Sequence, residues 1–387
     1  MGMWWISSAN SREAMNWIST TQDFNSLTSG IRADGCFRAT TPHGGLTQEI
    51  ESILELAADG DSLRIISPII DDPGVVDLLC DARKRGVVVR ILAPLTDNRG
   101  KMVTKGWDAS LNVKEIHHDV IRTLAKVGVL LRSPRTTPHT KLVHLDRRKA
   151  VFGSANLTKN SLRGRALEAA IVIDDQASLS GTKDAFDRIW RSSPYSMKAL
   201  AGAVTLDEKL QKSHATESQE SSHWCLGDAK LFLSAPAIGV ISEKLTELIN
   251  GAKFEIFLIT MSLYETDTIP GFGDALLAAL RRGVHVRAVV RPEHFKTDKY
   301  PDPATVELIK HGMELRGITG LHAKGILIDK QFCGILSANF NPYSLNGQRT
   351  EANWETAIVG SALAPALKDF AAFVEKLACN PTHEFVH

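Results

Sequence analysis

The sequence predicts an α/β protein made of two pseudosymmetric α/β/α halves, each with a mixed sheet flanked by helices. Two observations lead to this prediction. A strand–helix–strand pattern occurs twice along the chain, and a polar motif follows each copy with the same internal spacing. Because a duplicated fold can bring its two motifs together, we expect the active site at the interface of the halves.

The repeated unit covers residues 63–94 and 254–290. Each copy begins with an apolar strand, continues through a loop and a helix with one apolar side, and ends in a second apolar strand. An arginine, a glycine and a valine precede the second strand in both copies, with the glycines at Gly86 and Gly283. Units of this kind pair their strands in parallel through a right-handed crossover.

Each half then passes through the polar motif to a further apolar strand and a final helix. We expect these strands at 169–173 and 357–359, and amphipathic helices at 183–190 and 365–377. The same order of elements in both halves supports the duplication.

The domain organisation follows from the repeat. We expect a first half at 46–204, a linker at 205–222 and a second half at 223–387, since the linker segment is polar and lacks apolar periodicity. Residues 1–45 have no counterpart in the second half, and their three tryptophans favour a packed N-terminal extension.

The composition is that of a globular protein with little net charge. The 387 residues include 45 lysines and arginines against 44 aspartates and glutamates, so any attraction to nucleic acid or anionic membrane must be local. The chain start lacks the features of a signal peptide, and no run of about 18 apolar residues occurs, so we expect a cytoplasmic protein without an integral membrane segment. The cysteines have neither zinc-site nor disulfide-framework spacing, and we expect no metal or other cofactor. They are Cys36, Cys80, Cys225, Cys333 and Cys379.

The polar motif is His-x-Lys-x4-Asp followed by a serine and an asparagine. The histidine and the asparagine are seventeen positions apart in both copies. Residues two apart on a strand share a face, and the short segment after the aspartate suits a hairpin, so the polar side chains can converge. The first copy is His139, Lys141, Asp146, Gly153, Ser154 and Asn156, and the second is His322, Lys324, Asp329, Ser337 and Asn339.

An imidazole, an ammonium and a carboxamide on adjacent strands suit a phosphate group. Lysine supplies positive charge, asparagine supplies N–H donors, and histidine can attack phosphorus or move a proton near neutral pH. Two such sets facing each other can divide the chemistry, with one histidine as the nucleophile and the other as the general acid. One chain carries both sets, so chemistry does not require a homodimer.

The repeated motif resembles that of the phospholipase D superfamily, in particular its nuclease-like branch, and the similarity extends from about residue 46 onward. The resemblance implies a metal-independent, two-step phosphodiesterase reaction through a phosphohistidine at a cleft between the halves. It implies that His139 is the nucleophile and His322 the acid, and that four side chains bind the phosphate: Lys141, Lys324, Asn156 and Asn339.

The resemblance also implies a carboxylate near the far end of each motif. Glu168 and Glu355 occupy matching places, and each is expected to hydrogen-bond the histidine of the opposite half. Asp146 and Asp329 begin the hairpin turns and are expected to be structural. Leu336 replaces the glycine of the first copy, and we expect it to reshape the pocket floor on that side.

Several residues around the motifs receive separate interpretations. We expect His144 to face the core, and His117 and His118 to lie before a helix in a surface or capping role. Tryptophans 190, 224 and 354 are expected in the core. The expected substrate-binding residues are the two motif serines and the cations that flank the first motif: Ser154, Ser337, Arg132, Arg135, Lys159, Arg163 and Arg165.

Three functions remain open from the sequence. We favour a nuclease that cleaves DNA or RNA, because of the flanking cations and the Ser-Ala-Asn-Leu-Thr segment at 154–158, which resembles nuclease-like members. The alternative is a phospholipase D or phosphatidyltransferase acting on phospholipid, whose segment 261–273 could meet a lipid interface. The third is an inactive nucleic-acid-binding module of a larger complex, and the intact motif residues argue against it.

Overall fold

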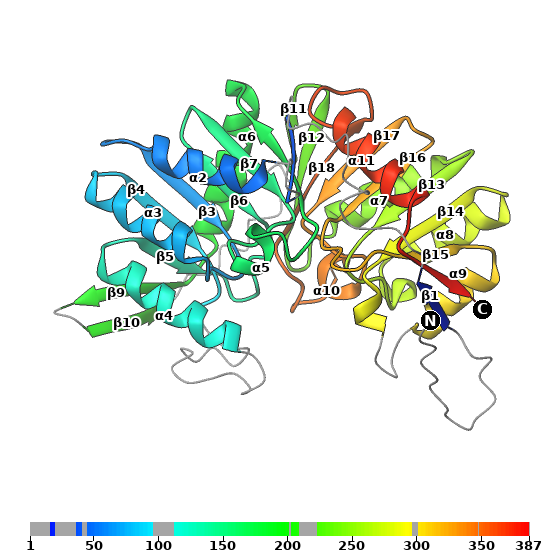
Figure 1. Cartoon of the computed structure of the whole chain (residues 1–387), viewed down its shortest axis with the longest axis horizontal. Helices are drawn as coiled ribbons and strands as arrows, with labels where there is room; N and C mark the ends of the chain where they lie inside the picture. The colour runs from blue at the N-terminus through cyan, green and yellow to red at the C-terminus, as the bar shows by residue number, and fades with distance from the viewer. Residues whose placement is uncertain are drawn as a thin grey trace.

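The computed structural model describes residues 16–19, 36–40, 45–95, 112–200, 203–208, 223–295, 301–346 and 348–386. These residues form two mixed sheets that lie side by side (Figure 1), one with the strand order β10-β9-β5-β4-β3-β6-β7-β8-β2 and one with the order β1-β19-β15-β14-β13-β16-β17-β18-β12-β11. The two pseudosymmetric α/β halves predicted from the sequence are confirmed.

The first half contains the strands of the nine-stranded sheet. Its elements are β2 (Phe37–Ala39), α2 (Leu46–Leu56), β3 (Ser62–Ile66), α3 (Pro73–Lys84), β4 (Val88–Leu92), α4 (Asn112–Lys126), β5 (Leu130–Ser133), β6 (Leu142–Leu145), β7 (Lys149–Gly153), α5 (Lys159–Leu162), β8 (Ala169–Ile173), α6 (Gln176–Arg191), β9 (Tyr195–Leu200) and β10 (Ala203–Glu208).

The second half contains most of the ten-stranded sheet. Its elements are β11 (His223–Leu226), β12 (Ala229–Ser234), α7 (Val240–Gly251), β13 (Glu255–Ile259), η2 (Thr266–Thr268), α8 (Phe272–Arg281), β14 (His285–Val290), η3 (Pro292–Phe295), α9 (Pro303–Lys310), β15 (Glu314–Gly317), β16 (Gly325–Ile328), β17 (Phe332–Leu336), α10 (Pro342–Leu345), β18 (Glu355–Ser361), α11 (Lys368–Cys379) and β19 (His383–Val386). Strand β1 (Asn16–Ser19), from the start of the chain, joins the same sheet.

The predicted strand–helix–strand repeat forms as expected. Strands β3 and β4 pair in parallel across α3, and β13 and β14 pair in parallel across α8. Asp72 begins α3 by accepting a hydrogen bond from Val75 N, and Pro73 occupies the first turn. Gly86 and Gly283 have φ of 91° and 83°, a left-handed conformation that glycine adopts without strain. The chain can therefore turn sharply into the next strand at both places.

The final helix of each half differs from its predicted bounds. Helix α6 begins seven residues earlier than expected, at Gln176, because Asp175 caps it by accepting from Ser178 N. Helix α11 begins at Lys368 rather than 365. Apolar periodicity located the buried face of each helix, and at α6 the capping residue decided where the helix starts.

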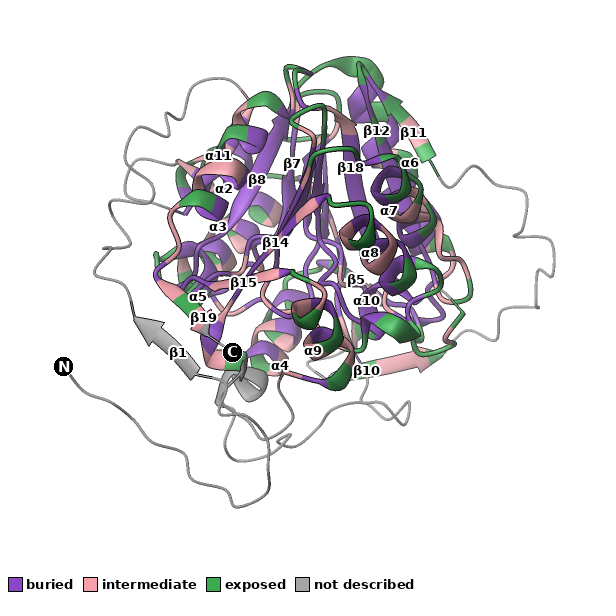
Figure 2. Cartoon of the chain, turned by 90° about the vertical axis from the view of Figure 1, so that its right-hand side faces the viewer, coloured by how far each residue is buried: buried purple, intermediate pink, exposed green. Residues whose placement is uncertain are grey.

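The core has three parts, and one of them belongs to both halves. Helices α2, α3 and α4 cover the outer face of the first sheet, and α7, α8 and α9 cover that of the second. Between the sheets lies a shared core that includes residues of α6 and α11 and the inner strands of both halves (Figure 2). Phe37 of β2 packs with its ring centroid 5.2 Å from that of Phe373 on α11. The halves are therefore joined by a common hydrophobic core.

Part of the N-terminal extension has a counterpart, contrary to the prediction. Strand β2 pairs with β8 at the position that β12 occupies beside β18 in the second sheet. Strand β1 pairs with β19 as β10 pairs with β9. Only β2 contradicts the prediction, since the counterpart of β1 is β10, which belongs to the first half. Strand β2 has three residues, too few for a clear apolar alternation. Of the expected linker, residues 205–208 belong to β10 and 209–222 lie outside the described residues.

Candidate active site

The two motifs lie at the ends of hairpin strands rather than within them. His139 and Lys141 precede β6, and Ser154 and Asn156 follow β7. Strands β6 and β7 pair antiparallel from Leu142–Phe152 to Leu145–Lys149, so the four polar residues emerge together at one end of the hairpin. The second copy repeats this arrangement at β16 and β17. The predicted convergence is therefore correct, although turns and extended segments produce it, not strand alternation.

Backbone hydrogen bonds join the two motif segments across the halves. His139 N donates to Trp354 O at 2.8 Å, and His322 N donates to Leu167 O at 2.9 Å. Trp354 and Leu167 immediately precede Glu355 and Glu168. Each histidine is therefore held beside the opposite half's carboxylate by the main chain.

The side chains repeat this pairing. His139 Nδ1 lies 2.7 Å from Glu355 Oε1, and His322 Nδ1 lies 2.7 Å from Glu168 Oε1. Both carboxylates have no exposed surface. The resemblance to phospholipase D implied that each glutamate meets the histidine of the opposite half, and the described geometry has this form. The arrangement fixes the orientation of each ring, as a triad carboxylate does.

The charge states of these pairs favour neutral imidazoles. Burial lowers the pKa of His139, and it lowers the pKa of His322 to about 4. Burial alone would raise the pKa of Glu168, but the charge and hydrogen bond of His322 and the charge of Lys324 outweigh it and hold that pKa at about 2. An ionised carboxylate must accept the proton of Nδ1, so Nε2 keeps a free lone pair that can attack phosphorus.

The motif serines hold the glutamates instead of meeting solvent. Ser154 Oγ donates to Glu168 Oε2 at 2.5 Å, and Ser337 Oγ donates to Glu355 Oε2. Both serines are fully buried. The prediction that they bind substrate therefore does not fit the structure, because their hydroxyl groups already orient the carboxylates.

The two motif lysines are buried. Lys141 Nζ donates to His139 O at 2.6 Å, and Lys324 Nζ donates to His322 O. Burial lowers the pKa of Lys141 to about 7 and that of Lys324 to about 8. A buried cation is costly without a partner of opposite charge. Two of them beside the histidines form a site that an anionic phosphate would stabilise.

The two asparagines are held differently. Asn339 Oδ1 accepts from Thr260 Oγ1 at 3.2 Å, which leaves its amide N–H groups as donors. Asn156 Oδ1 is buried and has no hydrogen-bond partner in the described part of the protein. Thr260 was not predicted, because a threonine at the end of a strand carries no motif.

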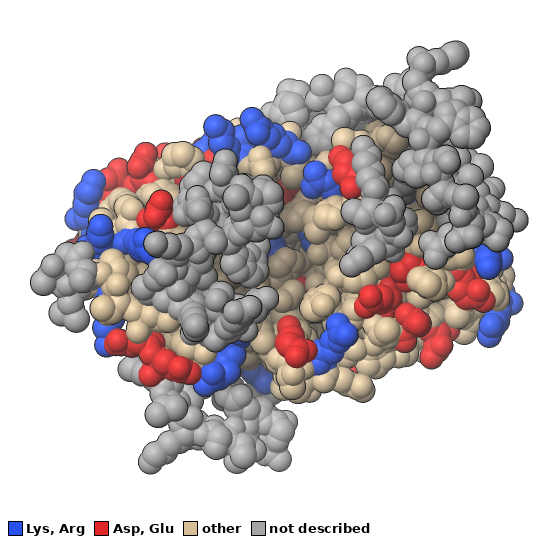
Figure 3. All heavy atoms as spheres, turned by 90° about the horizontal axis from the view of Figure 1, so that it is seen from below, with Lys and Arg blue, Asp and Glu red and all other residues tan. Residues whose placement is uncertain are grey.

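Most of the flanking cations are engaged within the first half. Arg132 donates to Trp190 O, Arg135 donates to Glu208, and Arg163 forms two hydrogen bonds with Asp72 at 2.7 and 2.8 Å. Because these three arginines already have partners within the protein, we do not expect them to bind substrate. Lys159 and Arg165 are exposed. Viewed from below (Figure 3), positive and negative side chains are interspersed over the described part of that face.

The structure shows the surroundings of Leu336 and of the histidines and tryptophans near the motifs. Leu336 is buried in the outer core of the second half, so its side chain packs against hydrophobic residues and does not form a pocket floor. His117 lies inside α4, not before a helix, and it is buried with Nδ1 accepting from Ile70 N. His144 is buried, with Nδ1 3.0 Å from Thr182 Oγ1. Trp354 is buried in the core, and Trp190 and Trp224 pack against it.

Three apolar residues of the segment 261–273 are buried. Leu263, Ile269 and Phe272 are buried in the outer core of the second half. Residues 266–268 form η2, and Phe272 begins α8. Tertiary packing therefore keeps these three side chains from a lipid interface, whereas Met261 and Tyr264 are partly exposed.

The predicted aspartates anchor the hairpin turns. Asp146 Oδ2 accepts from Ser62 N, and Asp329 accepts from the backbone N–H groups of three consecutive residues, 253 to 255. Among the described residues, no group of three or more His, Cys, Asp or Glu side chains could hold a metal ion. In the same described ranges, no helix has the length and apolar character needed to cross a membrane.

The fold and the paired motifs define a phospholipase D-like protein. The family model described as "Cardiolipin synthase, PLD-like domain" matches residues 52–190 and 245–374, which is more than half of the chain. The chain belongs to this phospholipase D-like family. No curated protein matches the sequence.

Two solved structures with TM-scores above 0.5, a phosphatidylserine synthase and a polyphosphate kinase, share this fold. Phosphatidylserine synthase from Haemophilus influenzae Rd KW20 aligns over 92% of this chain and 88% of its own, at 9% identity and a TM-score of 0.65. Polyphosphate kinase from Porphyromonas gingivalis aligns over 90% of this chain and 48% of its own, at 14% identity and a TM-score of 0.58, so the present chain spans about half the length of that kinase. Nuc, a phospholipase D family member from Salmonella typhimurium, aligns over 41% of this chain and 99% of its own, at 20% identity and a TM-score of 0.32.

Proposed function

We propose that this protein cleaves phosphodiesters in two steps through a phosphohistidine, without a metal ion, and that its substrate is a nucleic acid. The observation that carries the chemistry is the crossed pairing of His139 with Glu355 and of His322 with Glu168, beside two buried lysines. This set supplies a nucleophile, an acid and positive charge at one place.

In the first step His139 Nε2 attacks phosphorus, and the bond from phosphorus to the leaving oxygen breaks. His322 Nε2 donates a proton to that oxygen, so the leaving group departs as an alcohol. The pKa of His322 is about 4 in the free protein, and an anionic phosphodiester beside the ring would raise it, because negative charge favours the protonated imidazole. Lys141 and Lys324 stabilise the charge on the non-bridging oxygens.

In the second step water attacks the phosphohistidine. His322 accepts the water proton, the phosphorus–nitrogen bond breaks, and a phosphomonoester leaves. Glu168 and Glu355 remain ionised and hold the rings in the required tautomer throughout. The Asn156 and Asn339 side chains bind the phosphate, as the resemblance implies.

The substrate proposal rests on exposed cations and on the resemblance of segment 154–158 to nuclease-like members. Lys159 and Arg165 follow Asn156 and are exposed. The backbone of Arg165 lies against Gly320, two residues before His322, so this arginine is at the seam of the halves. A cation there can follow a nucleic-acid backbone.

A second candidate is a lipid headgroup transferase or phospholipase. It is favoured by the matched family model, whose description names cardiolipin synthase, and by the fold shared with a phosphatidylserine synthase. The buried apolar residues of segment 261–273 weigh against it, because they cannot enter a lipid surface.

A cleavage panel in chelator tests both candidates. Single-stranded DNA, double-stranded DNA, RNA and phospholipid vesicles are incubated with the unaltered protein, His139→Ala, His322→Ala and His223→Ala, the last being an exposed histidine on β11 as a control. We expect nucleic-acid cleavage by the unaltered protein and His223→Ala only. A requirement for divalent metal, or activity in both motif variants, would contradict the mechanism. Turnover of lipid alone would contradict the nucleic-acid substrate and favour the second candidate. Binding of nucleic acid without cleavage would indicate an inactive module.

A further inference from the structure

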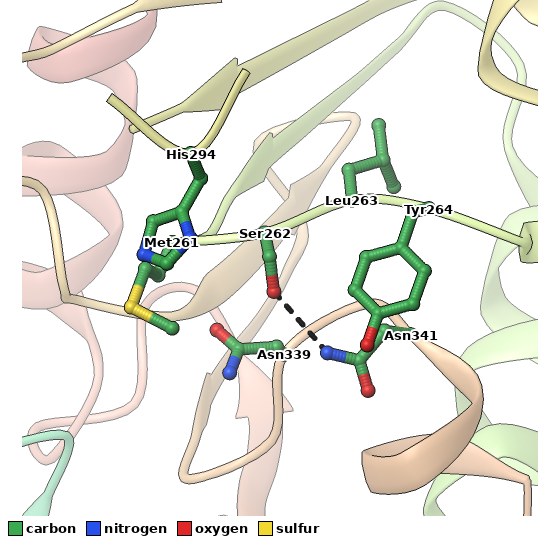
Figure 4. Close-up of a pocket in the computed structure, with 7 residues that line it drawn as sticks. All are labelled: Met261, Ser262, Leu263, Tyr264, His294, Asn339 and Asn341. Carbon is green, nitrogen blue, oxygen red and sulfur yellow. Dashed lines mark hydrogen bonds between the residues drawn. The ribbon is translucent and has the colours of Figure 1, made fainter. Parts of the chain in front are cut away.

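A cavity of about 210 Å³ lies directly beside Asn339 in the second half. The segment after β13 supplies one wall, η3 supplies His294, and the segment after β17 supplies Asn339 and Asn341 (Figure 4). Under the proposed function Asn339 binds the phosphate, so a group esterified to that phosphate would extend into the cavity. Its full lining is Met261, Ser262, Leu263, Tyr264, His294, Asn339 and Asn341.

The lining combines the phenol ring of Tyr264 with several hydrogen-bonding groups. In Figure 4 the Tyr264 ring and the Asn341 amide lie on one side of Asn339, and the His294 ring lies across from them. The cavity is smaller than the roughly 300–1,000 Å³ typical of pockets for drug-sized ligands. A single planar heterocycle with its sugar suits this size and polarity, whereas an acyl chain would leave the polar groups unpaired.

Hydrogen bonds hold the wall in place. Asn341 Nδ2 donates to Ser262 Oγ at 3.2 Å, and Thr260 Oγ1 lies within hydrogen-bond distance of both Ser262 O and Asn339 Oδ1. Tyr264 N donates to Phe340 O at 3.2 Å, which fixes the start of the tyrosine side chain. The Tyr264 ring is therefore attached to a hydrogen-bonded backbone segment, next to Asn339, the residue proposed to bind the phosphate.

The first half differs at the equivalent place. The bridge between Ile70 and Leu157 corresponds to that between Leu263 and Phe340, so Asp71 is the counterpart of Tyr264. Asp71 is a carboxylate that accepts from Lys159 N at 2.8 Å. A ring for stacking is thus present on one side of the pseudosymmetric site and a negative charge on the other.

We propose that the cavity is a nucleoside subsite in which Tyr264 stacks on the base attached to the bound phosphate. The inference rests on the proposed function and specifies its substrate: a nucleotide unit is recognised by the second half, mainly through stacking. Stacking tolerates any base, so the subsite would favour nucleic acid over other phosphodiesters without reading sequence.

Calorimetric titration of small phosphates tests this subsite independently of turnover. Thymidine 5′-monophosphate, thymidine 3′-monophosphate, glycerol 3-phosphate and inorganic phosphate are titrated into the full chain. We expect at least one nucleotide to bind roughly tenfold more tightly than inorganic phosphate, as one stacked base contributes. Tyr264→Ala should remove that advantage and leave inorganic phosphate binding unchanged, whereas Tyr264→Phe should keep it.

Asp71→Ala is the matched control, because it alters the same position of the other half. It should leave the nucleotide advantage intact. Glycerol 3-phosphate binding as tight as the nucleotides and insensitive to Tyr264→Ala would overturn the inference, as would a nucleotide advantage that Tyr264→Ala does not reduce.

Hydrolysis of glycerophosphoglycerol, a phosphodiester without an aromatic ring, separates the two proposals. The unaltered protein should hydrolyse it, because the proposed chemistry requires the motif residues and not the ring of Tyr264. If the unaltered protein does not hydrolyse the ester at all, the proposed function fails, while the titrations still decide whether the subsite exists.

Discussion

At the scale of single residues, the serines, glutamates and histidines of the site form two hydrogen-bonded chains. Ser154 orients Glu168, Glu168 orients His322, and the backbone of Leu167 holds the same histidine. The second copy repeats this order with Ser337, Glu355 and His139. A change at one position should therefore act through the ring that it orients.

Replacing a glutamate by its amide tests this orientation. Glu355→Gln keeps the size of the side chain but can present a donor to His139 Nδ1 and so favour the wrong tautomer. We expect kcat to fall by roughly 10²–10⁴-fold with little change in KM, as for a triad carboxylate. Steady-state kinetics on the cleaved substrate measure the effect, with Glu351→Gln, an exposed glutamate, as the control. A change confined to KM would show that Glu355 binds substrate instead.

The buried lysines predict how activity depends on pH. The pKa values of Lys141 and Lys324 are about 7 and about 8, so both lose their charge as pH rises through this range, and kcat/KM should fall. Lys141→Arg should move the start of this decline from about 7 toward the pKa of Lys324, which is about 8, because the guanidinium stays protonated. A pH profile of kcat/KM from 5 to 10 would be measured on both proteins, and an unchanged high-pH limb in the variant would contradict the assignment.

Stability should change in the opposite direction over that range. The ordinary pKa of lysine is 10.5, above the value of about 7 for Lys141 in the folded protein. Between these values the unfolded chain binds more protons than the folded chain, so the free energy of unfolding should rise with pH until about 10.5. Urea denaturation at several pH values provides this second readout.

At the scale of elements, the two hairpins show how pseudosymmetric halves pack differently. Gly153 and Leu336 end equivalent strands. A Cβ at position 153 would lie 2.2 Å from Ala169 O on β8, whereas Leu336 points into the outer core of its half. The glycine is therefore required by the close approach of the backbone, whereas the leucine packs in the outer core of its half.

Gly153→Ala should consequently destabilise the protein although alanine is small. The overlap is with main-chain atoms, which cannot rotate away, so we expect a loss of about 1–3 kcal/mol in the free energy of unfolding. Denaturant titration measures the loss. Gly251→Ala is the matched control, since its Cβ would meet no atom within 4 Å. Equal stability of the two variants would contradict this account of the hairpin.

At the scale of the whole molecule, the shared core makes the two halves depend on each other. Phe37 lies on β2 of the first sheet, and its ring is 5.2 Å and 6.0 Å from those of Phe373 and Phe370 on α11 of the second half. The active-site contacts also cross between the halves. Separation of the halves would expose this apolar surface and leave both histidines without carboxylates.

Phe37→Ala tests this dependence. We expect a loss of about 3–5 kcal/mol in the free energy of unfolding, because a fully buried ring is removed from the shared core. Unfolding should be a single transition that tryptophan fluorescence and far-ultraviolet circular dichroism report together. Phe254→Ala, which removes an exposed ring, is the control. Two separate transitions would mean that the halves unfold independently.

The sequence by itself determined the duplicated α/β fold and the residues of the two motifs. It could do so because apolar periodicity reports which face of an element is buried, and because a repeated spacing of His, Lys and Asn is independent of the surrounding packing. The pairing of Glu168 and Glu355 with the opposite histidines came from family resemblance, since no local pattern encodes a contact between residues more than 150 positions apart.

Only the tertiary structure decided which of the polar residues around the motifs are available. From their places in the sequence, Ser154, Ser337 and Arg163 were predicted to bind substrate. In the structure, neighbouring carboxylates already accept their hydrogen bonds. The cavity at Tyr264 arises where the segments after β13 and β17 meet, and these are distant in the chain. The fold decides which residues pack against or hydrogen-bond the motifs, and these residues are distant in the chain. The sequence therefore predicted the motif residues and their chemistry, but not the residues that surround them.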